Sequence, residues 1–230
     1  MKNQEDYTKM QKVFYEAETP IMAQMNHRHH DANPDYYGIL LQPLTQGDWS
    51  NKRALDFGCG CGRNVMNMLS SRFNLKEAHG CDISGNNIEY CKKLLTDQNY
   101  KNFNFFVTNG NDLGSAQDGY YDFIMSTIVL QHICVYSIRK KILEHMYKVL
   151  SKNGIISIQM GFGYSHPNTA EYYDEATHAS VTNSGHDVRV TDPNQLIKDF
   201  QEIGFKNIET VIRPAFADSH SEWIFVKATK

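Results

Sequence analysis

The chain has 230 residues and a formal net charge of −3, with 23 Lys and Arg residues against 26 Asp and Glu residues. This length allows one domain with a buried core, and the balanced charge argues against nucleic acid or an anionic membrane as a partner. The chain has neither a run of about 18 apolar residues nor a signal-peptide core, so we expect a soluble, cytoplasmic protein whose partner is small and near neutral.

Residues 1–50 contain few glycines and predict a helical extension ahead of the first strand. Within this extension, His27, His29, His30 and Asp31 are possible metal ligands. The histidines lack the i, i+4 spacing that would place two imidazoles on one face of a helix. We therefore predict no metal site.

Strands and helices alternate through the middle of the chain. The apolar run at 52–57 (KRALDF) is typical of a buried parallel strand, and residues 64–73 follow it at helical spacing. The alternation continues with strands at 77–83, 103–108, 121–128 and 154–160 and with helices at 84–98 and 136–150. This order predicts an α/β fold with a parallel sheet covered by helices on both faces.

The composition changes after residue 160. Residues 161–187 are rich in Gly, His, Tyr, Ser, Thr and Asn, which indicates an insertion near the top of the sheet. A capped helix at 192–203 is expected to stop at Gly204, and two closing strands are expected at 206–213 and 222–228. A single domain over residues 1–230 is the economical interpretation.

The turn after the first strand reads DFGCGCGRN, with glycines at positions 58, 60 and 62. Ligands of open α/β sheets bind at the carboxyl ends of the strands, and glycines there let a ligand approach the backbone closely. The dinucleotide pattern G-x-G-x-x-G would need its third glycine at Arg63. This departure weakens the hypothesis of a nicotinamide cofactor.

Two of the five cysteines, Cys59 and Cys61, lie between these glycines. An odd number of cysteines without a paired C-x2-C spacing favours neither a disulfide framework nor a zinc site. We interpret both cysteines as small residues of the turn.

The sequence DFGCGCG, followed by the acid of GCDIS, resembles the first two motifs of class I S-adenosylmethionine-dependent methyltransferases. The resemblance implies a Rossmann-like, doubly wound, mostly parallel seven-stranded sheet with an antiparallel closing strand and an N-terminal helical extension. It also implies S-adenosylmethionine as the cofactor. Asp56 would lie by the amino-acid end of the cofactor, and the turn of Gly58, Cys59 and Gly60 would accept its methionine portion. Asp82, followed by Ile83, would bind both ribose hydroxyls through charge-assisted hydrogen bonds.

Further motifs extend the resemblance over most of residues 50–160. The stretch NGNDL (109–113) resembles the loop that reads adenine, which makes Asn111, Asp112 and Leu113 candidates for cofactor binding. YDFI and STIVLQH resemble the fourth-strand motif and bring Thr127 and Ile128 to the cofactor. VLSKNG (149–154) resembles the usual Leu-Lys-Pro-Gly-Gly turn, from which Lys152 and Asn153 depart.

The resemblance also divides the domain by role. Residues 1–50 would form a lid in which Tyr36 or Tyr37, and secondarily Arg28, contact the carboxylate end of the cofactor. An ordinary helix and turn packed on the sheet is the alternative for this segment. Residues 51–160 would form the cofactor-binding core, 161–190 a substrate-side insertion, and 191–230 the closing helix and strands.

His132 ends the fourth-strand motif and is the candidate general base, with a structural histidine at the start of the next helix as the alternative. In the insertion, Tyr164, His166, Tyr172 and Tyr173 are candidates for an acceptor pocket. A solvated loop is the alternative there.

Methyl transfer from a sulfonium needs collinear alignment more than it needs a catalytic triad. The Asn/Asp-Pro-Pro-Tyr type of motif is replaced by Ser126-Thr127-Ile128-Val129, and no Lys/Arg-rich stripe is present. These features favour a small-molecule acceptor. Aminocarboxypropyl transfer, a cyclisation that releases methylthioadenosine, and a non-catalytic cofactor-binding module remain alternatives. The sequence predicts no particular oligomeric state.

Overall fold

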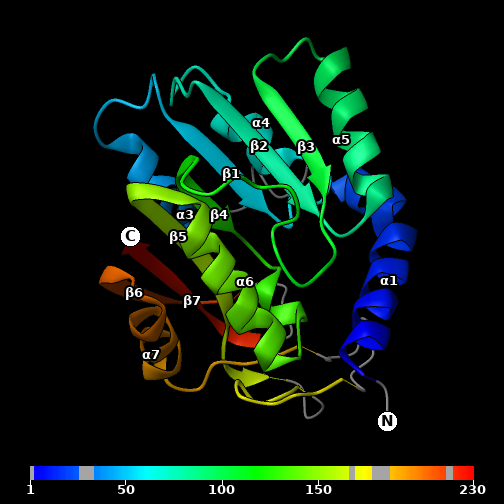
Figure 1. The fold of residues 1–230 in the computed structure, drawn as a ribbon, viewed down its shortest axis with the longest axis vertical. Helices are drawn as coiled ribbons and strands as arrows, with labels where there is room; N and C mark the ends of the chain where they lie inside the picture. The colour runs from blue at the N-terminus through cyan, green and yellow to red at the C-terminus, as the bar shows by residue number, and fades with distance from the viewer. Residues whose placement is uncertain (1–2, 26–33, 166–168, 178–186, 216–219) are drawn as a thin grey trace.

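The computed structural model describes residues 3–25, 34–165, 169–177, 187–215 and 220–230. Seven strands form one sheet in the order β3-β2-β1-β4-β5-β7-β6 (Figure 1). The strand β7 runs antiparallel to both of its neighbours, whereas β1 to β5 pair in parallel. The predicted mostly parallel sheet with an antiparallel closing strand is confirmed. The strands are β1 (Arg53–Phe57), β2 (Glu77–Asp82), β3 (Phe103–Val107), β4 (Tyr121–Ser126), β5 (Leu150–Ser165), β6 (Lys206–Pro214) and β7 (His220–Thr229).

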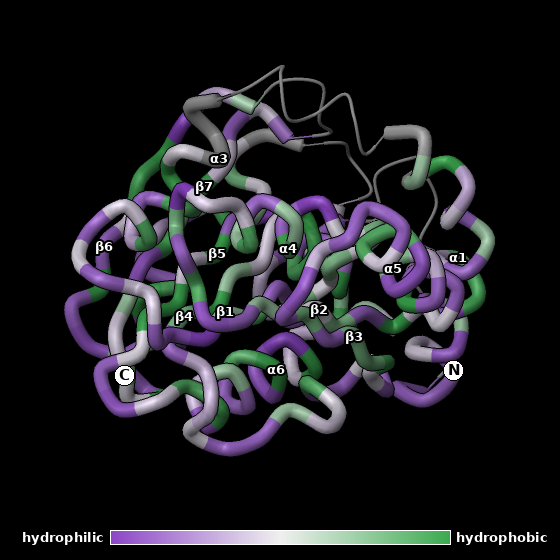
Figure 2. Tube along the Cα trace, turned by 90° about the horizontal axis from the view of Figure 1, so that it is seen from above, coloured by the Kyte–Doolittle hydropathy of each residue, from purple (hydrophilic) through white to green (hydrophobic). Residues whose placement is uncertain are grey.

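Helices cover both faces of the sheet (Figure 2). One apolar core lies under α6 and α7 and contains Ile138 and Phe200, and the other lies under α3, α4 and α5 and contains Val65 and Leu95. The sheet is therefore doubly wound, as predicted. The helices are α1 (Gln4–Met25), α3 (Pro34–Leu41), α4 (Arg63–Met68), α5 (Gly85–Asp97), α6 (Tyr136–Val149) and α7 (Pro193–Ile203), with 3-10 turns η1 (Gln42–Thr45) and η2 (Leu130–His132). Among the described residues, no helix is both long and apolar enough to cross a membrane.

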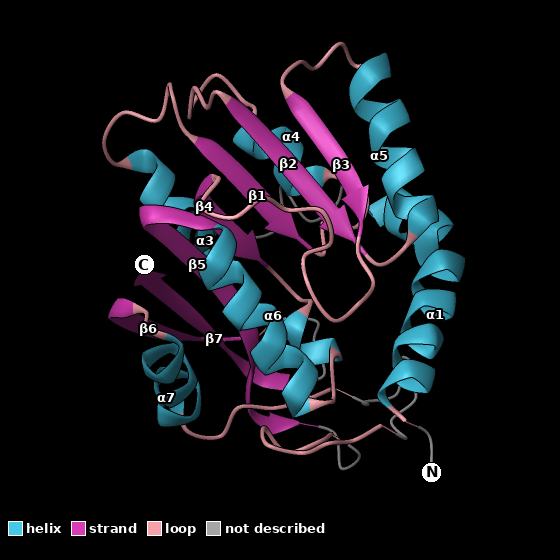
Figure 3. Cartoon of the chain, in the orientation of Figure 1, coloured by secondary structure: helices cyan, strands magenta, loops and turns pink. Residues whose placement is uncertain are grey.

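The N-terminal helix α1 lies along the β3 side of the sheet, beside α5 (Figure 3). The Thr19 hydroxyl of α1 donates a hydrogen bond of 2.7 Å to the Asn87 side chain of α5. The Asn86 amide donates at 3.1 Å to the carbonyl of Glu16. These contacts hold α1 over the end of the sheet where β2 and β3 terminate.

The largest differences from the predicted element boundaries are in α4 and β5, whereas the other boundaries shift by no more than two residues. The helix expected over 64–73 ends at Met68, because Leu69 and the following residues form tight turns. The strand β5 runs well beyond the predicted 154–160, because it continues to pair with β7 as far as Ser165 opposite His220. The predicted stop of α7 is confirmed, since Gly204 ends it in the left-handed conformation at φ 113°.

Apolar residues in the described part of the stretch after β5 belong to the core. Val188 and Val190 are fully buried, and bridges join Val190 to Phe162 and Val188 to Ala170. Residues 187–190 therefore run beside the extended part of β5, where β4 has already ended at Ser126. The alternative of a solvated loop does not hold for these described residues.

Candidate active site

The glycine-rich turn is pinned to the end of the neighbouring strand. The backbone N–H groups of Gly58 and Cys59 both donate to the carbonyl of Cys81, at 2.8 and 3.0 Å. Gly58 has φ 72°, and a Cβ there would lie 2.3 Å from a methyl carbon of Val129. Only glycine fits this position, because both the backbone conformation and the space exclude a side chain.

Asp82, the last residue of β2, is buried and faces this turn. Its Oδ2 accepts the Gly60 N–H at 2.9 Å, and its Oδ1 accepts the Ser84 N–H at 2.8 Å and the Asn87 amide at 3.3 Å. Burial raises the pKa of this carboxyl, and the backbone donors act in the opposite direction. A carboxylate has about four lone-pair positions, so Oδ2 retains the capacity to accept from a ligand.

Asp56 lies deeper, at the end of β1, and is completely buried. Neither carboxylate oxygen has a hydrogen-bond partner of ordinary geometry within the described part of the chain. Burial raises the pKa of Asp56 to about 7, while the nearby Asn64 amide and the Arg63 charge pull it downward. Buried polar groups in folded proteins are normally hydrogen-bonded, so a buried carboxyl without such partners beside the glycine-rich turn calls for a functional explanation.

A cavity opens at the carboxyl ends of the strands, between the glycine turn, the loop after β4 and the helix α1. About 680 Å³ of space is not filled by atoms there, a figure that includes the open mouth of the cavity. The helix α1 forms one wall, and residues at the ends of β1 and β2 or in the loops after β1 to β4 form the rest. The lining residues are Tyr7, Thr8, Gln11, Tyr15, Phe57, Gly58, Gly60, Asp82, Ile83, Thr108, Gly110, Ile128, Val129, His132 and Ile133.

His132 lies in this lining and is paired with an acid from a distant segment. Its Nδ1 is 2.6 Å from Oδ1 of Asp187. The ring of Tyr15 lies beside the imidazole, with 6.4 Å between the ring centroids. Burial and the neighbouring Asp187 charge raise the pKa of the Tyr15 phenol well above its ordinary value, so this hydroxyl stays protonated.

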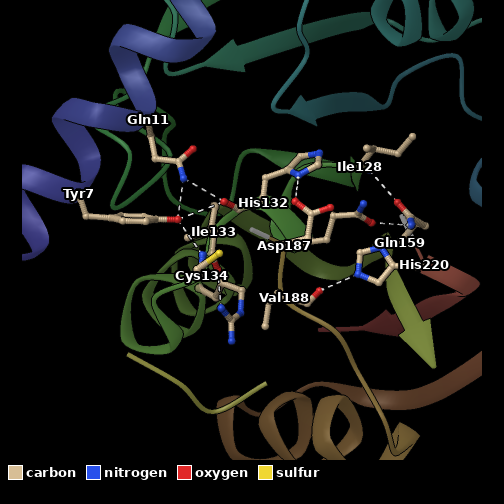
Figure 4. A network of polar contacts seen from close by, with 12 residues as sticks. Tyr7, Gln11, Ile128, His132, Ile133, Cys134, Gln159, Asp187, Val188 and His220 are labelled. Carbon is tan, nitrogen blue, oxygen red and sulfur yellow. Dashed lines mark hydrogen bonds and ion pairs between the residues drawn. The ribbon is translucent and has the colours of Figure 1, made fainter. Parts of the chain in front are cut away.

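The loop that carries His132 is fastened to α1 by a compact set of hydrogen bonds (Figure 4). The Tyr7 hydroxyl donates to the His132 carbonyl at 3.1 Å and accepts from the Cys134 N–H at 2.7 Å. The Gln11 amide donates to the Tyr7 oxygen at 2.6 Å and to the His132 carbonyl at 3.0 Å. The position of α1 and the position of His132 are thus coupled.

The structure brings a subset of the predicted site residues together around one cavity. Those that line it are Gly58, Gly60, Asp82, Ile83, Ile128 and His132. Asp56, Cys59 and Thr127 are buried behind the lining. All five cysteines belong to the described residues; they are buried, and no disulfide joins any of them.

The loop after β3 presents different residues from the predicted ones. Thr108 and Gly110 line the cavity, whereas Asn111 and Asp112 lie outside the lining. The Asp112 carboxylate instead accepts hydrogen bonds from the Asn109 amide and the Gly114 N–H. Leu113 is buried in the core on the α6 side, and its N–H donates to His145 at 3.0 Å.

The two predicted acceptor tyrosines that are described lie away from the cavity. The Tyr172 hydroxyl donates to the buried Asp199 carboxylate at 2.7 Å, and the Tyr173 ring packs edge-on against Tyr136. Their partners on α6 and α7 hold both rings outside the lining. Arg28 and His166, together with the side chains of Tyr36, Tyr37 and Tyr164, lie outside the described residues.

The same limit applies to His27, His29, His30 and Asp31, the possible metal ligands of the N-terminal segment. Among the side chains that the structure does describe, no group of three or more His, Cys, Asp or Glu residues is arranged to hold a metal ion.

Several site residues carry no sequence motif. Tyr7, Gln11 and Tyr15 follow one another at four-residue spacing on α1, and this spacing is the one signal that could have indicated a common face. Asp187 lies in a stretch without periodicity, and only the fold brings it to His132.

Comparisons with known proteins place this geometry in context. The sequence model of a family described as a methyltransferase domain matches residues 48–210, more than half of the chain. Comparison with the curated proteins finds no relative.

Solved structures share the fold at low sequence identity. A phosphoethanolamine N-methyltransferase 2 from Haemonchus contortus, solved with phosphomonomethylethanolamine and S-adenosylhomocysteine, has a TM-score of 0.71 at 16% identity over 100% of this chain. This chain covers 60% of that protein. The [4+2]-cyclase SpnF has a TM-score of 0.70 at 14% identity over 95% of this chain and 94% of its own. A methyltransferase from Aquifex aeolicus has a TM-score of 0.64 at 13% identity over 92% and 97%.

Proposed function

Because the chain belongs to the class I S-adenosylmethionine-dependent methyltransferases, we propose that it binds S-adenosylmethionine in the described cavity and methylates a small-molecule acceptor. His132 is the general base of this proposal. The observation that carries it is that Asp82, the glycine turn and His132 line one cavity, and that His132 is paired with Asp187.

The residues around the turn fit the cofactor. Asp82 stands at the strand end with an oxygen that can still accept from a ribose hydroxyl, and the turn from Gly58 to Gly60 has no side chain at its two glycines to block the methionine portion. The buried Asp56 carboxyl adds acceptor oxygens that the described residues leave unused. Ile83 and Ile128 offer apolar contact for the adenine ring. When bound, this cofactor supplies an electrophilic methyl group on a sulfonium.

The proposed role of His132 follows from its hydrogen bond to Asp187. A carboxylate accepts from an N–H, so Nδ1 carries the proton and the lone pair lies on Nε2. Nε2 can then take a proton from an acceptor hydroxyl or amine as that group attacks the methyl carbon. The Asp187 carboxylate stabilises the imidazolium that forms. A positioned base of this kind contributes about 10²- to 10⁴-fold to the rate.

Tyr15 complements this base as a hydrogen-bond donor. Its phenol stays protonated because burial and the Asp187 charge oppose ionisation. It can hold the acceptor or the cofactor in place but cannot compete with His132 for the proton.

A second candidate function keeps the cofactor site and changes the reaction. The similarity to a protein named as a [4+2]-cyclase supports it, because that fold is not restricted to methyl transfer. Aminocarboxypropyl transfer or ring closure would release methylthioadenosine in place of S-adenosylhomocysteine. Retention of intact cofactor would indicate a binding module.

The deciding experiment is chromatography of the nucleoside product after incubation with S-adenosylmethionine and fractions of a metabolite extract. We expect S-adenosylhomocysteine, formed in proportion to a methylated small molecule. His132→Gln protein with unchanged cofactor binding is the matched control, and its turnover should fall. Methylthioadenosine as the product would replace the proposal by the second candidate, and unconsumed cofactor would replace it by the binding module.

A further inference from the structure

The His132–Asp187 pair is held in place by buried polar side chains that do not reach the cavity. They are Gln159 on β5, Gln131 on η2 and His220 on β7, named here the positioning relay. All three are at most 4% exposed, and none belongs to the cavity lining. We propose that Gln159 is a positioning residue for the proposed base, acting through Gln131 and the backbone next to Asp187. This inference rests on the proposed function of His132.

Gln159 connects β5 to both ends of the turn that precedes His132. Its Oε1 accepts the Ile128 N–H at 2.7 Å, and its Nε2 donates to Oε1 of Gln131 at 3.0 Å (Figure 4). Ile128 has φ 54°, a left-handed conformation that β-branched residues rarely adopt. The hydrogen bond to Gln159 therefore holds a strained turn in the shape that presents His132 to the cavity.

Gln131 also contacts the segment that contains Asp187. Its backbone carbonyl accepts the N–H of Val188 at 2.7 Å, and Val188 directly follows Asp187. The carbonyl of the same residue, Val188, lies 3.2 Å from Nε2 of His220. The backbone beside Asp187 is thus held from η2 and from β7 at once.

The imidazole of His220 packs against the sheet at Gly161, where no side chain is present. A Cβ at Gly161 of β5 would lie 2.3 Å from the ring of His220, so the imidazole occupies the place of a side chain there. The Gly161 carbonyl in turn accepts the Val190 N–H at 3.0 Å. Residues 187–190 are therefore registered against β5 by the same strand that carries Gln159.

These contacts argue for a geometric role. Replacing two hydrogen-bonded buried groups by apolar side chains of similar shape is often nearly neutral for stability. Methionine at both glutamine positions would satisfy packing alone. The two amides additionally specify the distance and direction between β5 and the turn before His132, which are 28 residues apart in the chain. The relay is therefore expected to affect the His132–Asp187 hydrogen bond more than the fold.

The test compares Gln159→Met with Ser157→Ala, which removes a buried hydroxyl two residues earlier on the same strand. The first readout is the low-field proton resonance of the His132 Nδ1–H in the full chain with S-adenosylhomocysteine, assigned by its loss in Asp187→Asn. The second is turnover together with the affinity for S-adenosylhomocysteine. We expect Gln159→Met to lose or broaden the resonance and to lower turnover roughly tenfold with affinity unchanged. Ser157→Ala should retain both.

An unchanged resonance and unchanged turnover in a folded Gln159→Met protein would overturn the relay. If that variant does not fold, the Gln131→Met and Gln131→Met/Gln159→Met proteins are read by the same criteria. A failure of the proposed function gives a different result. If His132 is not the base, His132→Gln retains full turnover, and the His132 resonance in the Gln159→Met protein still shows whether Gln159 positions the imidazole.

Discussion

The Nδ1 atom of His132 and the Oδ1 atom of Asp187 are 2.6 Å apart, although 55 residues of chain separate them. The side chains of this pair are 25% and 15% exposed, so the interaction is partly shielded from water. The acid fixes which imidazole nitrogen carries the proton, so the lone pair of the neutral ring lies on Nε2. In the proposed reaction, this pairing would give the base a defined orientation.

Replacement of Asp187 by Asn should preserve the shape of this pair and remove its charge. We expect turnover to fall by roughly 10²-fold, because the imidazolium loses its stabilising partner and the tautomer is no longer imposed. The affinity for S-adenosylhomocysteine, measured by the shift in melting temperature, should stay close to that of the original protein. Asp174→Asn, a change in the same region that does not touch His132, serves as the control. Equal turnover in the Asp187→Asn protein would contradict the assignment of His132 as the base.

Asp82 is the residue on which cofactor affinity should depend most. We expect Asp82→Ala to lose the stabilisation that S-adenosylhomocysteine gives to the folded protein, because the carboxylate contacts both the glycine turn and the space beside it. The measurement is the ligand-induced shift in melting temperature.

Asp112→Ala provides the comparison for Asp82, since Asp112 carries the same group but lies outside the cavity lining. Its ligand-induced shift should remain. If the shift disappeared in Asp112→Ala but persisted in Asp82→Ala, the ribose assignment of Asp82 would be wrong. That result would support the predicted adenine-binding role of the loop after β3.

The predictable part of this site is the part that is local in sequence. The turn from Gly58 to Gly62 and the acid at Asp82 follow consecutive strands, so their spacing along the chain already reports their position at the sheet edge. The loop after β3 shows the limit of that logic. The motif predicts contacts at residues 111–113, whereas in the structure Thr108 and Gly110 are the residues of this loop that line the cavity.

The unpredicted part consists of contacts between distant segments. Tyr7 meets His132 across 125 residues, and Gln159 meets Gln131 across 28. Hydrophobic periodicity locates elements, but it does not say which polar side chain of one element faces another. The burial of Val188 and Val190 was missed for the same reason, since they are single apolar residues in a polar stretch that completes an existing sheet.

Tyr7→Phe should test how firmly α1 is fastened over the cavity. The change leaves the buried Cys134 N–H without its acceptor and removes one partner of the Gln11 amide. We expect the free energy of unfolding to fall by about 1–3 kcal/mol, the cost of an unsatisfied buried donor. Urea denaturation provides the measurement.

The matched variant for Tyr7 is Tyr15→Phe, two helical turns further along α1. Its hydroxyl makes none of the hydrogen bonds that join Tyr7 to the loop at 132–134, so its stability should change less while its turnover responds more. If both variants lost the same stability, the fastening of α1 would not depend on the Tyr7 hydroxyl.

The buried Asp56 carboxyl should make the stability of the ligand-free protein depend on pH in an unusual direction. Its pKa of about 7 lies above the ordinary value of 3.8, so the folded state holds a proton that the unfolded state releases. The proton is held in both states below about pH 4 and in the folded state alone between about pH 4 and 7. The contribution of Asp56 to stability is therefore fully present below that window and is lost as the pH rises through it, by up to about 4 kcal/mol.

Asp56→Asn cannot ionise and should lack this decline. Both proteins are unfolded with urea at each pH without cofactor. As the pH rises from about 4 to 8, we expect the free energy of unfolding of the variant to increase relative to that of the original protein. Asp118→Asn, which removes an exposed carboxylate paired with Lys148, should leave the decline in place. Parallel stability curves for Asp56→Asn and the original protein would mean that Asp56 is already ionised in the folded state, held by Arg63 and Asn64 more strongly than burial opposes it.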